Sequence, residues 1–295
     1  MWRSKDKIIV VTMGDPGGIG PEVIRKALTH RSILRRGRFI VIGDKKILGR
    51  ISSSVTVVDV PYRSAGEGAL KFLDLAVAVI KDGIADALVT APLSKKAVNQ
   101  FSANFVGHTE YLAQAFDVKN FDMMFIAPQV RLTIVTRHVP LKDVSRLITP
   151  KVVFDSIALM ARTLKDDFKI PTPKIAVLGL NPHAGEGGLL GTEDRKCIVP
   201  AILKAKAQGI RAQGPFPADT FFAHHAGYDG IIAMYHDQGL APLKGMYMKE
   251  LVNYTAGLPF VRTSPAHGTA FDIAGKNKAD PSSMIAAIKL ACELA

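Results

Sequence analysis

Three apolar runs of this chain, each about as long as a buried strand, end close to a histidine. The runs and their histidines are 132–136 with His138, 177–180 with His183 and 230–234 with His236. Short apolar runs bounded by glycine and polar residues are typical of buried strands. In open α/β sheets ligands bind at the carboxyl ends of the strands. Three neutral imidazoles can hold Zn²⁺ or a similar ion and leave positions open for a substrate.

The pattern therefore favours an α/β chain with one shared metal site. No two of the three histidines are neighbours in sequence, so each alone is equally typical of a polar loop residue. Asp219 and Asp237 could complete the metal shell or act as a general base, and either could instead cap a helix.

Most of the remaining chain alternates between strand-like and helix-like stretches. Strands are predicted at 7–13, 38–43, 55–60, 86–92, 123–127, 132–136, 174–180 and 229–234. Helices are predicted at 21–28, 69–81, 150–165, 192–207, 219–225 and 281–294. Further helices are predicted after Ser94, which would cap its helix, and after Gly107. Gly239 is expected to interrupt the regular secondary structure after the last of these strands. The alternation predicts the α/β class.

Size and composition agree with a globular protein. The 295 residues can bury a large core, and 48% hydrophobic with 22% charged residues is ordinary for such chains. No apolar run approaches the roughly 20 residues of a membrane span. The charged N-terminus, residues 1–7, precedes an apolar run too short for a secretory signal. Two cysteines, Cys197 and Cys292, indicate packing roles in a reducing cytoplasm rather than a disulfide framework.

The formal net charge of +12 raises the question of an anionic partner. The basic residues are scattered, with the densest cluster at 35–38, and the aromatic residues do not interleave with them as in a base-stacking surface. We interpret most of the charge as solvated surface and expect neither nucleic acid nor membrane as a partner. A nucleic-acid-binding protein is the alternative, and it predicts steeply salt-dependent binding.

The glycine-rich turn at 14–20 invites comparison with a dinucleotide site. Its spacing is G-x-x-G-G-x-G rather than G-x-G-x-x-G, although Asp44 follows the second predicted strand, where a Rossmann ribose ligand would lie. A tight turn with close helix packing explains the glycines at least as well.

Cationic and polar residues near the predicted strand ends are candidates for binding a phosphate. Lysine and arginine bind phosphate through charge-assisted hydrogen bonds, and the start of a helix near residue 108 would add free backbone N–H groups. Each residue alone is typical of a surface position. The candidates are His108, Thr109, Lys244, Asn253 and Arg262.

The segment 267–277, H-G-T-A-F-D-I-A-G-K-N, is too long and too rich in glycine and alanine to be a simple connection. It resembles the H-G-[ST]-A-P-D-I-A-G-K loop of the isopropylmalate and isocitrate dehydrogenases. In those enzymes the loop wraps around the adenosine of a nicotinamide cofactor without a Rossmann fingerprint.

Further motifs extend the resemblance over nearly the whole chain. They are T-M-G-D-P-G-G-I-G-P-E (12–22), G-H-T-E-Y-L (107–112), L-N-P-H-A-G-E-G-G (180–188), G-P-F-P-A-D-T (214–220), M-Y-H-D-Q-G (234–239) and L-P-F-V-R-T-S (258–264). With them the chain resembles the 4-hydroxythreonine-4-phosphate dehydrogenase family of vitamin B6 biosynthesis.

The resemblance implies two α/β/α domains of the isocitrate/isopropylmalate dehydrogenase type, with the active site in the cleft between them. It implies a cytoplasmic homodimer whose partner chain completes that site. Residues 1–102 with 247–295 would form the terminal domain and carry the cofactor loop. Residues 103–246 would form the middle domain and carry the metal ligands and the dimer interface.

The resemblance also assigns roles to individual residues. His138, His183 and His236 match the metal ligands, and the five phosphate candidates match the substrate-binding residues. Gly268, Thr269, Asp272 and Asn277 match cofactor-binding positions. Asp272 matches the carboxylate that bonds the adenosine ribose hydroxyls, and it would repel a 2′-phosphate, which favours NAD over NADP.

The implied reaction oxidises 4-phosphohydroxy-L-threonine at C3 and then decarboxylates it to 3-amino-2-oxopropyl phosphate, with NAD and one divalent ion (Zn, Mg, Mn or Co). Asp219 is the candidate base and Lys244 a second catalytic candidate. The closest rival is a paralogue acting on D-threonate or D-erythronate 4-phosphate. A metal-dependent hydrolase that works without NAD is more remote.

Three features depart from the family pattern. The segment between the first helix and Leu88 looks short by about one strand and helix, Leu189 stands where a histidine is expected, and Phe271 replaces the proline of the loop. None of them removes a proposed metal or phosphate ligand.

Overall fold

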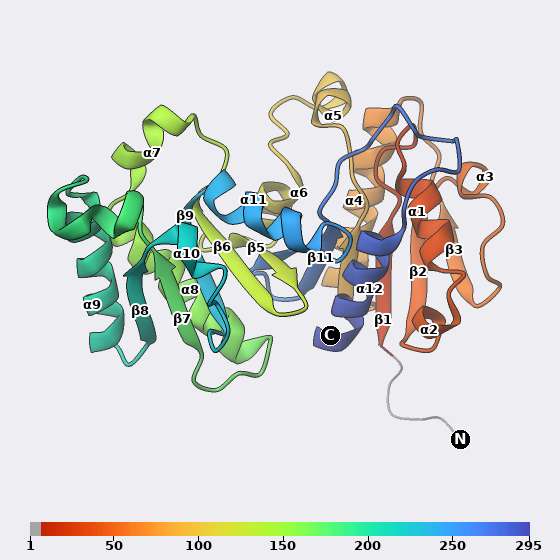
Figure 1. Cartoon of the computed structure of the whole chain (residues 1–295). Helices are drawn as coiled ribbons and strands as arrows, with labels where there is room; N and C mark the ends of the chain where they lie inside the picture. The colour runs from red at the N-terminus through yellow and green to blue at the C-terminus, as the bar shows by residue number, and fades with distance from the viewer. Residues whose placement is uncertain (1–6) are drawn as a thin grey trace. The chain divides into compact units, whose positions relative to one another are not determined.

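The computed structural model describes residues 7–295, and the chain divides into two compact units (Figure 1). Unit 1 comprises residues 1–119 and 249–295, and unit 2 comprises residues 120–248. Residues 103–119, which the family resemblance placed in the middle domain, therefore pack with unit 1. The charged N-terminal residues 1–6 lie outside the described part of the chain.

The sheet strands of unit 1 lie in the order β3-β2-β1-β4-β11-β10. The first five are mutually parallel, and β10 pairs antiparallel with β11. Ile9, Val10 and Val11, three consecutive residues of β1, are fully buried, as expected for a parallel sheet covered on both faces. The bounds are β1 (Ile8–Thr12), β2 (Arg38–Gly43), β3 (Val55–Asp59), β4 (Ala87–Thr90), β10 (Val252–Ala256) and β11 (Val261–Pro265).

Three of the described helices of unit 1, α3, α4 and α5, begin at residues whose side chains cap them. Ser94 accepts a hydrogen bond from the Ala97 N–H, which confirms its predicted role. Asp44, which follows the second predicted strand, caps a helix by accepting from the N–H groups of Lys46 and Ile47. The bounds are α1 (Gly20–Ala27), α2 (Arg31–Leu34), α3 (Lys45–Leu48), α4 (Ala65–Lys81), α5 (Lys95–Phe101), α6 (His108–Ala115) and α12 (Ser282–Leu294).

The glycine-rich turn after β1 serves close packing of the backbone. Gly14 has φ of 72°, and a Cβ there would lie 2.2 Å from the carbonyl oxygen of Pro92. A Cβ on Gly20 would lie equally close to the Met13 carbonyl oxygen. Both positions require glycine because no side chain fits between these main-chain segments.

The strands of unit 2 lie in the order β5-β6-β9-β7-β8. β5 and β6 pair antiparallel, and the other pairings are parallel. Parallel strands alternating with helices in both units confirm the predicted α/β class. The bounds are β5 (Asp122–Ala127), β6 (Val130–Thr136), β7 (Lys174–Leu178), β8 (Arg211–Phe216) and β9 (Gly230–Tyr235).

One prediction in unit 2 is confirmed and another is corrected. The predicted helix at 192–207 is present, and it opens with a π-helical turn before it continues as an α-helix to Ala207. Gly239 does not interrupt the secondary structure. It lies inside α11, which starts at His236 directly after β9. A Cβ on Gly239 would lie 2.7 Å from Leu132 Cδ2, so this glycine lets α11 pack against β6. The bounds are α7 (Leu141–Leu147), α8 (Pro150–Asp166), η1 (Pro182–Gly188), η2 (Asp194–Ile198), α9 (Val199–Ala207), α10 (Ala218–Phe221) and α11 (His236–Tyr247).

Residues 7–295 contain no helix with the length and apolarity needed to cross a membrane. Cys197 and Cys292 are free and half-buried, and burial raises the pKa of both thiols.

Candidate functional site

The three predicted metal-binding histidines of unit 2 follow adjacent parallel strands. β6, β9 and β7 are neighbours in the sheet, and His138, His236 and His183 come after their respective carboxyl ends. The carboxyl ends of parallel strands meet at one edge of a sheet, which is where open α/β sheets bind ligands. The strand-end placement deduced from the apolar runs is therefore correct.

Two of these histidines lie close together. The ring centroids of His138 and His236 are 5.7 Å apart. Two imidazoles on one tetrahedral ion, with metal–nitrogen distances of about 2.0–2.1 Å, place their centroids roughly 5 Å apart. The Nδ1 atom of His236 lies 2.9 Å from Asp237 Oδ1. A carboxylate on Nδ1 orients an imidazole and leaves Nε2 for a metal, so this pair fits part of a metal site.

His183 lies in a turn of unusual backbone conformation. The φ angles of His183, Ala184 and Glu186 are 52°, 53° and 42°. L-residues rarely adopt this left-handed region, and such strain is concentrated at functional sites. His183 is exposed, as is Leu189, which replaces the histidine expected from the family pattern.

The start of this turn is held by a buried carboxylate. Asp194 is 2% exposed and accepts hydrogen bonds from the N–H groups of Leu180 and Asn181 at 2.8 and 3.1 Å. The Asn181 side chain donates to the same carboxylate at 2.9 Å. Within residues 7–295 no set of three His, Cys, Asp or Glu side chains is arranged to hold a metal ion. The three-histidine site therefore stays a prediction.

Gln238 is a structural residue that sequence reasoning missed. Its Nε2 donates to the Gly179 carbonyl oxygen, and its Oε1 accepts from the Met234 N–H, both at 2.6 Å. The side chain thereby ties the end of β9 to the end of β7. The role of Gln238 depends on its place in the first turn of α11. Gly239, the next residue, concealed the start of that helix in the sequence.

A buried cation is the main feature of the predicted phosphate site. Arg262 on β11 is only 2% exposed. Its guanidinium donates to Thr255 Oγ1 at 3.0 Å and to Thr90 Oγ1 at 2.6 Å, while Nε has no partner in the described chain. Burial lowers the pKa of Arg262 to about 10, against the raising effect of Glu110. Arg262 is still charged at neutral pH, and a buried charge held by hydroxyls is suited to an anionic ligand.

His108 and Thr109 open α6 in the same unit. Burial, then the positive charges of Arg262 and Lys95, lower the pKa of His108 well below its usual value. The imidazole is therefore neutral at pH 7. Lys95 was missed by sequence reasoning, although it directly follows the predicted cap Ser94. Lys95 lies next to the start of α6, because its Cε would be 3.3 Å from a Cβ on Gly107.

The other phosphate candidates fall in both units. Asn253 lies on β10 opposite Ser264 of β11, and its Oδ1 is buried without a partner in the described chain. Thr109 is 3% exposed. Lys244 lies on α11 of unit 2 and is half-buried, and Asp219 on α10 is exposed. Unit 1 thus contains four of the five predicted phosphate ligands.

The predicted cofactor residues lie in an irregular segment of unit 1, residues 266–280, which we call the C-terminal loop. Ile19 N–H donates to the Thr269 carbonyl oxygen at 2.9 Å, and a Cβ on Gly18 would lie 3.1 Å from that oxygen. A cavity of about 300 Å³ lies between the glycine-rich turn and the loop. Gly17, Gly18, Gly275 and Asn277 are among its lining residues.

Not every predicted cofactor residue lines this cavity. Gly268 has open space around it, which leaves room beside the backbone. The Asp272 side chain is exposed, and its main-chain oxygen accepts from Lys276 Nζ at 2.7 Å.

Comparison with known proteins identifies the family. A family model described as "Pyridoxal phosphate biosynthetic protein PdxA" matches residues 27–291. This chain belongs to the PdxA family. A protein from Sulfurihydrogenibium sp. named 4-hydroxythreonine-4-phosphate dehydrogenase is 38% identical over 96% of this chain and 97% of that relative. That alignment runs over 312 positions, more than the 295 residues here, so the PdxA relative carries segments that this chain lacks.

Two further PdxA-like proteins are informative. A protein from Oceanobacillus iheyensis named "Putative D-threonate 4-phosphate dehydrogenase" is 39% identical, with 99% of each chain covered. The crystal structure of the 4-hydroxythreonine-4-phosphate dehydrogenase from Klebsiella pneumoniae matches with a TM-score of 0.89 and 35% identity over 99% of each chain. The resemblance deduced from the motifs is thereby confirmed.

Proposed function

We propose that this PdxA-family protein is a 4-hydroxythreonine-4-phosphate dehydrogenase. It oxidises 4-phosphohydroxy-L-threonine at C3 with NAD and a divalent metal ion, and decarboxylation then gives 3-amino-2-oxopropyl phosphate. The observation that carries the proposal is the Arg262 cluster, formed by Arg262, Thr90 and Thr255. Its buried cation has no carboxylate hydrogen-bond partner within residues 7–295, in a chain whose relatives are named for phosphorylated substrates.

The substrate phosphate binds Arg262, His108, Thr109 and Asn253 in unit 1. Lys244 keeps the substrate-binding role that the family resemblance implies for it. Thr90 and Thr255 hold the guanidinium in place before the substrate arrives, so little side-chain entropy is lost on binding. Neutral His108 offers one ring N–H as a donor, and the N-terminus of α6 favours negative charge.

His138, His183 and His236 are the residues that would hold the metal ion. A divalent ion there would act as a Lewis acid on the substrate hydroxyl. The all-imidazole set suits Zn²⁺, and Mg²⁺, Mn²⁺ and Co²⁺ are the alternatives if substrate oxygens complete the shell. Asp237 orients His236, and Asp219 is the proposed proton acceptor because its carboxylate is exposed.

The C-terminal loop would hold the cofactor through Gly268, Thr269, Asp272 and Asn277. NAD bound there would accept the hydride released from C3. The exposed carboxylate of Asp272 is available to ribose hydroxyls and would repel a 2′-phosphate, which favours NAD over NADP. The protein is further proposed to be a cytoplasmic homodimer in which the partner chain completes the active site.

A second candidate function is oxidation of D-threonate or D-erythronate 4-phosphate, favoured by the name of the Oceanobacillus relative. These substrates share the phosphate and differ from the first in carrying a hydroxyl in place of the amino group at C2. NADH formation at 340 nm, measured with each phosphate compound with and without a chelator, separates the two. Metal-dependent turnover of 4-phosphohydroxy-L-threonine alone supports the first function, and turnover of a sugar acid phosphate alone supports the second. A chain active on none of them would contradict both.

A further inference from the structure

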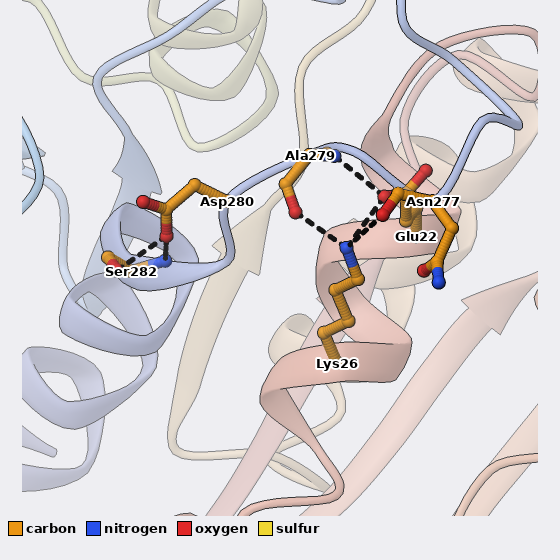
Figure 2. Close-up of polar contacts among 6 residues, drawn as sticks. All are labelled: Glu22, Lys26, Asn277, Ala279, Asp280 and Ser282. Atoms are coloured by element: carbon orange, nitrogen blue, oxygen red, sulfur yellow. Dashed lines mark hydrogen bonds and ion pairs between the residues drawn. The ribbon is translucent and has the colours of Figure 1, made fainter.

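Helix α1 holds the C-terminal loop at both of its ends. Near the start of the loop, the Ile19 N–H at the entry to α1 donates to the Thr269 carbonyl oxygen. Near the end of the loop, Glu22 and Lys26 of the same helix contact Asn277 and Ala279, as Figure 2 shows. These residues are about 250 positions apart in sequence. Between the two attachments the loop has irregular backbone without strand pairing.

The attachment at the far end is a closed set of short contacts. Lys26 Nζ lies 2.8 Å from Glu22 Oε1 and donates to the carbonyl oxygens of Asn277 and Ala279 at 3.1 and 2.8 Å. The same Glu22 oxygen accepts from the Ala279 N–H at 2.7 Å. All three protons of the ammonium group therefore have acceptors, and Ala279 is held through both its N–H and its carbonyl oxygen.

The Glu22 carboxylate is charged although it is buried. The residue is 4% exposed, and its Oε2 has no hydrogen-bond partner in the described chain. Burial alone would raise the pKa of Glu22, but hydrogen bonds from Lys26, Ala279 and Asn277 and the charge of Lys26 together lower it. Removing Lys26 leaves the buried charge of Glu22 uncompensated next to the loop.

The same contacts shape the cavity beside the loop. Glu22 and Asn277 are lining residues of the cavity of about 300 Å³, together with Gly17 and Gly18 of the glycine-rich turn. A shift of residues 277–279 away from α1 would therefore change one wall of the cavity.

We propose that Glu22 and Lys26 are positioning residues that hold the C-terminal loop in its cofactor-binding conformation. The inference rests on the proposed role of this loop in binding NAD. A loop that populates the binding conformation only part of the time lowers the apparent affinity by that fraction. The pair then governs the affinity for the cofactor, and it leaves the phosphate cluster and the histidines unaffected.

The test uses the variants Glu22→Gln and Lys26→Met in the full-length chain. Each is expected to raise the KM for NAD about tenfold, because the loop is no longer fixed. The kcat at saturating NAD and the KM for the phosphorylated substrate should stay within about twofold of the wild type. Hydrogen exchange at the Ala279 amide should speed up in the absence of any ligand. Lys26→Arg, which keeps the charge and the donors, should restore both readouts.

A matched ion pair in unit 1 provides the control. Lys71 Nζ lies 2.8 Å from Glu67 on α4, with the same spacing of four residues. Glu67 also accepts a backbone N–H, that of Arg63 at 2.7 Å, and Lys71 donates to the Pro61 carbonyl oxygen at 3.3 Å. Glu67→Gln and Lys71→Met should leave the KM for NAD and the exchange of Ala279 unchanged.

Three results would overturn the inference. Ala279 exchange at the wild-type rate in both variants would show that the pair does not hold the loop. Faster exchange with an unchanged KM for NAD would show that the held conformation does not matter for the cofactor. A wild-type chain that neither binds nor reduces NAD would remove the proposed function and the inference together, and that failure is visible before any variant is made.

Discussion

The Arg262 cluster of unit 1 and the histidines of unit 2 are both candidate ligand sites, but they are built differently. Arg262 is buried, two hydroxyls fix its guanidinium, and burial together with cationic neighbours keeps His108 neutral. His183 is exposed on a turn with left-handed backbone, and only His138 and His236 lie close to each other.

The difference lies in which interactions form each site. Hydrogen bonds within the chain hold the guanidinium of Arg262 in place, so the cluster exists before a substrate binds. In the second site Asp237 orients His236, but His183 lies on an exposed turn. Binding of the ion itself would supply the energy that brings the three imidazoles together. Changes to the first site should therefore affect substrate binding directly, and changes to the second should appear as lost metal affinity.

The largest effect is expected from Arg262→Met. Loss of the cation should reduce kcat/KM for the phosphorylated substrate by about 1000-fold, since removing one partner of a buried charged contact costs about 2–5 kcal/mol. Arg262→Lys should lose less, because the charge stays and only the planar fork is lost. Steady-state kinetics, with urea unfolding to verify the fold, measures the difference. A loss below tenfold for Arg262→Met would mean that the cluster does not bind the phosphate.

The next largest effect concerns the metal. His138→Ala, His183→Ala and His236→Ala should each weaken binding of Zn²⁺ by about 100-fold or more, measured by equilibrium dialysis with metal analysis. His225→Ala is the control, since His225 lies in unit 2 and its Nδ1 contacts the Phe222 carbonyl oxygen instead. Wild-type metal content and turnover in His183→Ala would refute the three-histidine site.

A smaller effect is expected from Gln238→Leu, which removes the link between the ends of β9 and β7. Two backbone groups lose their partners, at a cost of about 1–3 kcal/mol in the free energy of unfolding. Metal affinity should fall about tenfold, as for other changes that disturb the support of metal ligands. Urea unfolding and metal dialysis on one preparation give both values. Lost stability with full metal affinity would show that the alignment of the two strand ends is irrelevant to the ion.

The smallest effect is a pH dependence due to His108. Its folded-state pKa is lowered, so below about pH 6.5, the ordinary value, the unfolded chain binds more protons than the folded one. This contribution to stability is present at neutral pH and is lost as the pH falls. His108→Gln should remove it, and the wild type should lose stability faster than the variant between pH 7 and pH 5, by at most about 1.4 kcal/mol per pH unit. Parallel urea unfolding curves for the two proteins over this range would contradict the lowered pKa.

Features carried by neighbouring residues could be predicted from the sequence. The apolar runs before His138, His183 and His236 correctly indicated strands, and parallel pairing then placed these residues at one edge of unit 2. Ser94 was recognisable as a cap because its acceptor role is local.

Features that depend on distant contacts could not be predicted. Gly239 packs α11 against Leu132, more than 100 residues away, whereas from the sequence it was expected to interrupt the structure after the preceding strand. Gln238 bonds Gly179, and Glu22 bonds Ala279, without any pattern near either residue that indicates its partner. The left-handed turn at His183 likewise depends on Asp194 and leaves no local signature.

The most direct test of the contrast between the two sites is a crystal structure of the protein with Zn²⁺, with diffraction recorded at the zinc absorption edge. We expect one anomalous peak at the carboxyl ends of β6, β9 and β7, with a nitrogen of His138, His183 and His236 each about 2.0–2.2 Å from it. The Arg262 contacts to Thr90 and Thr255 should be unchanged. A peak bound by other residues, or by His138 and His236 without His183, would contradict a site that the ion assembles from all three histidines.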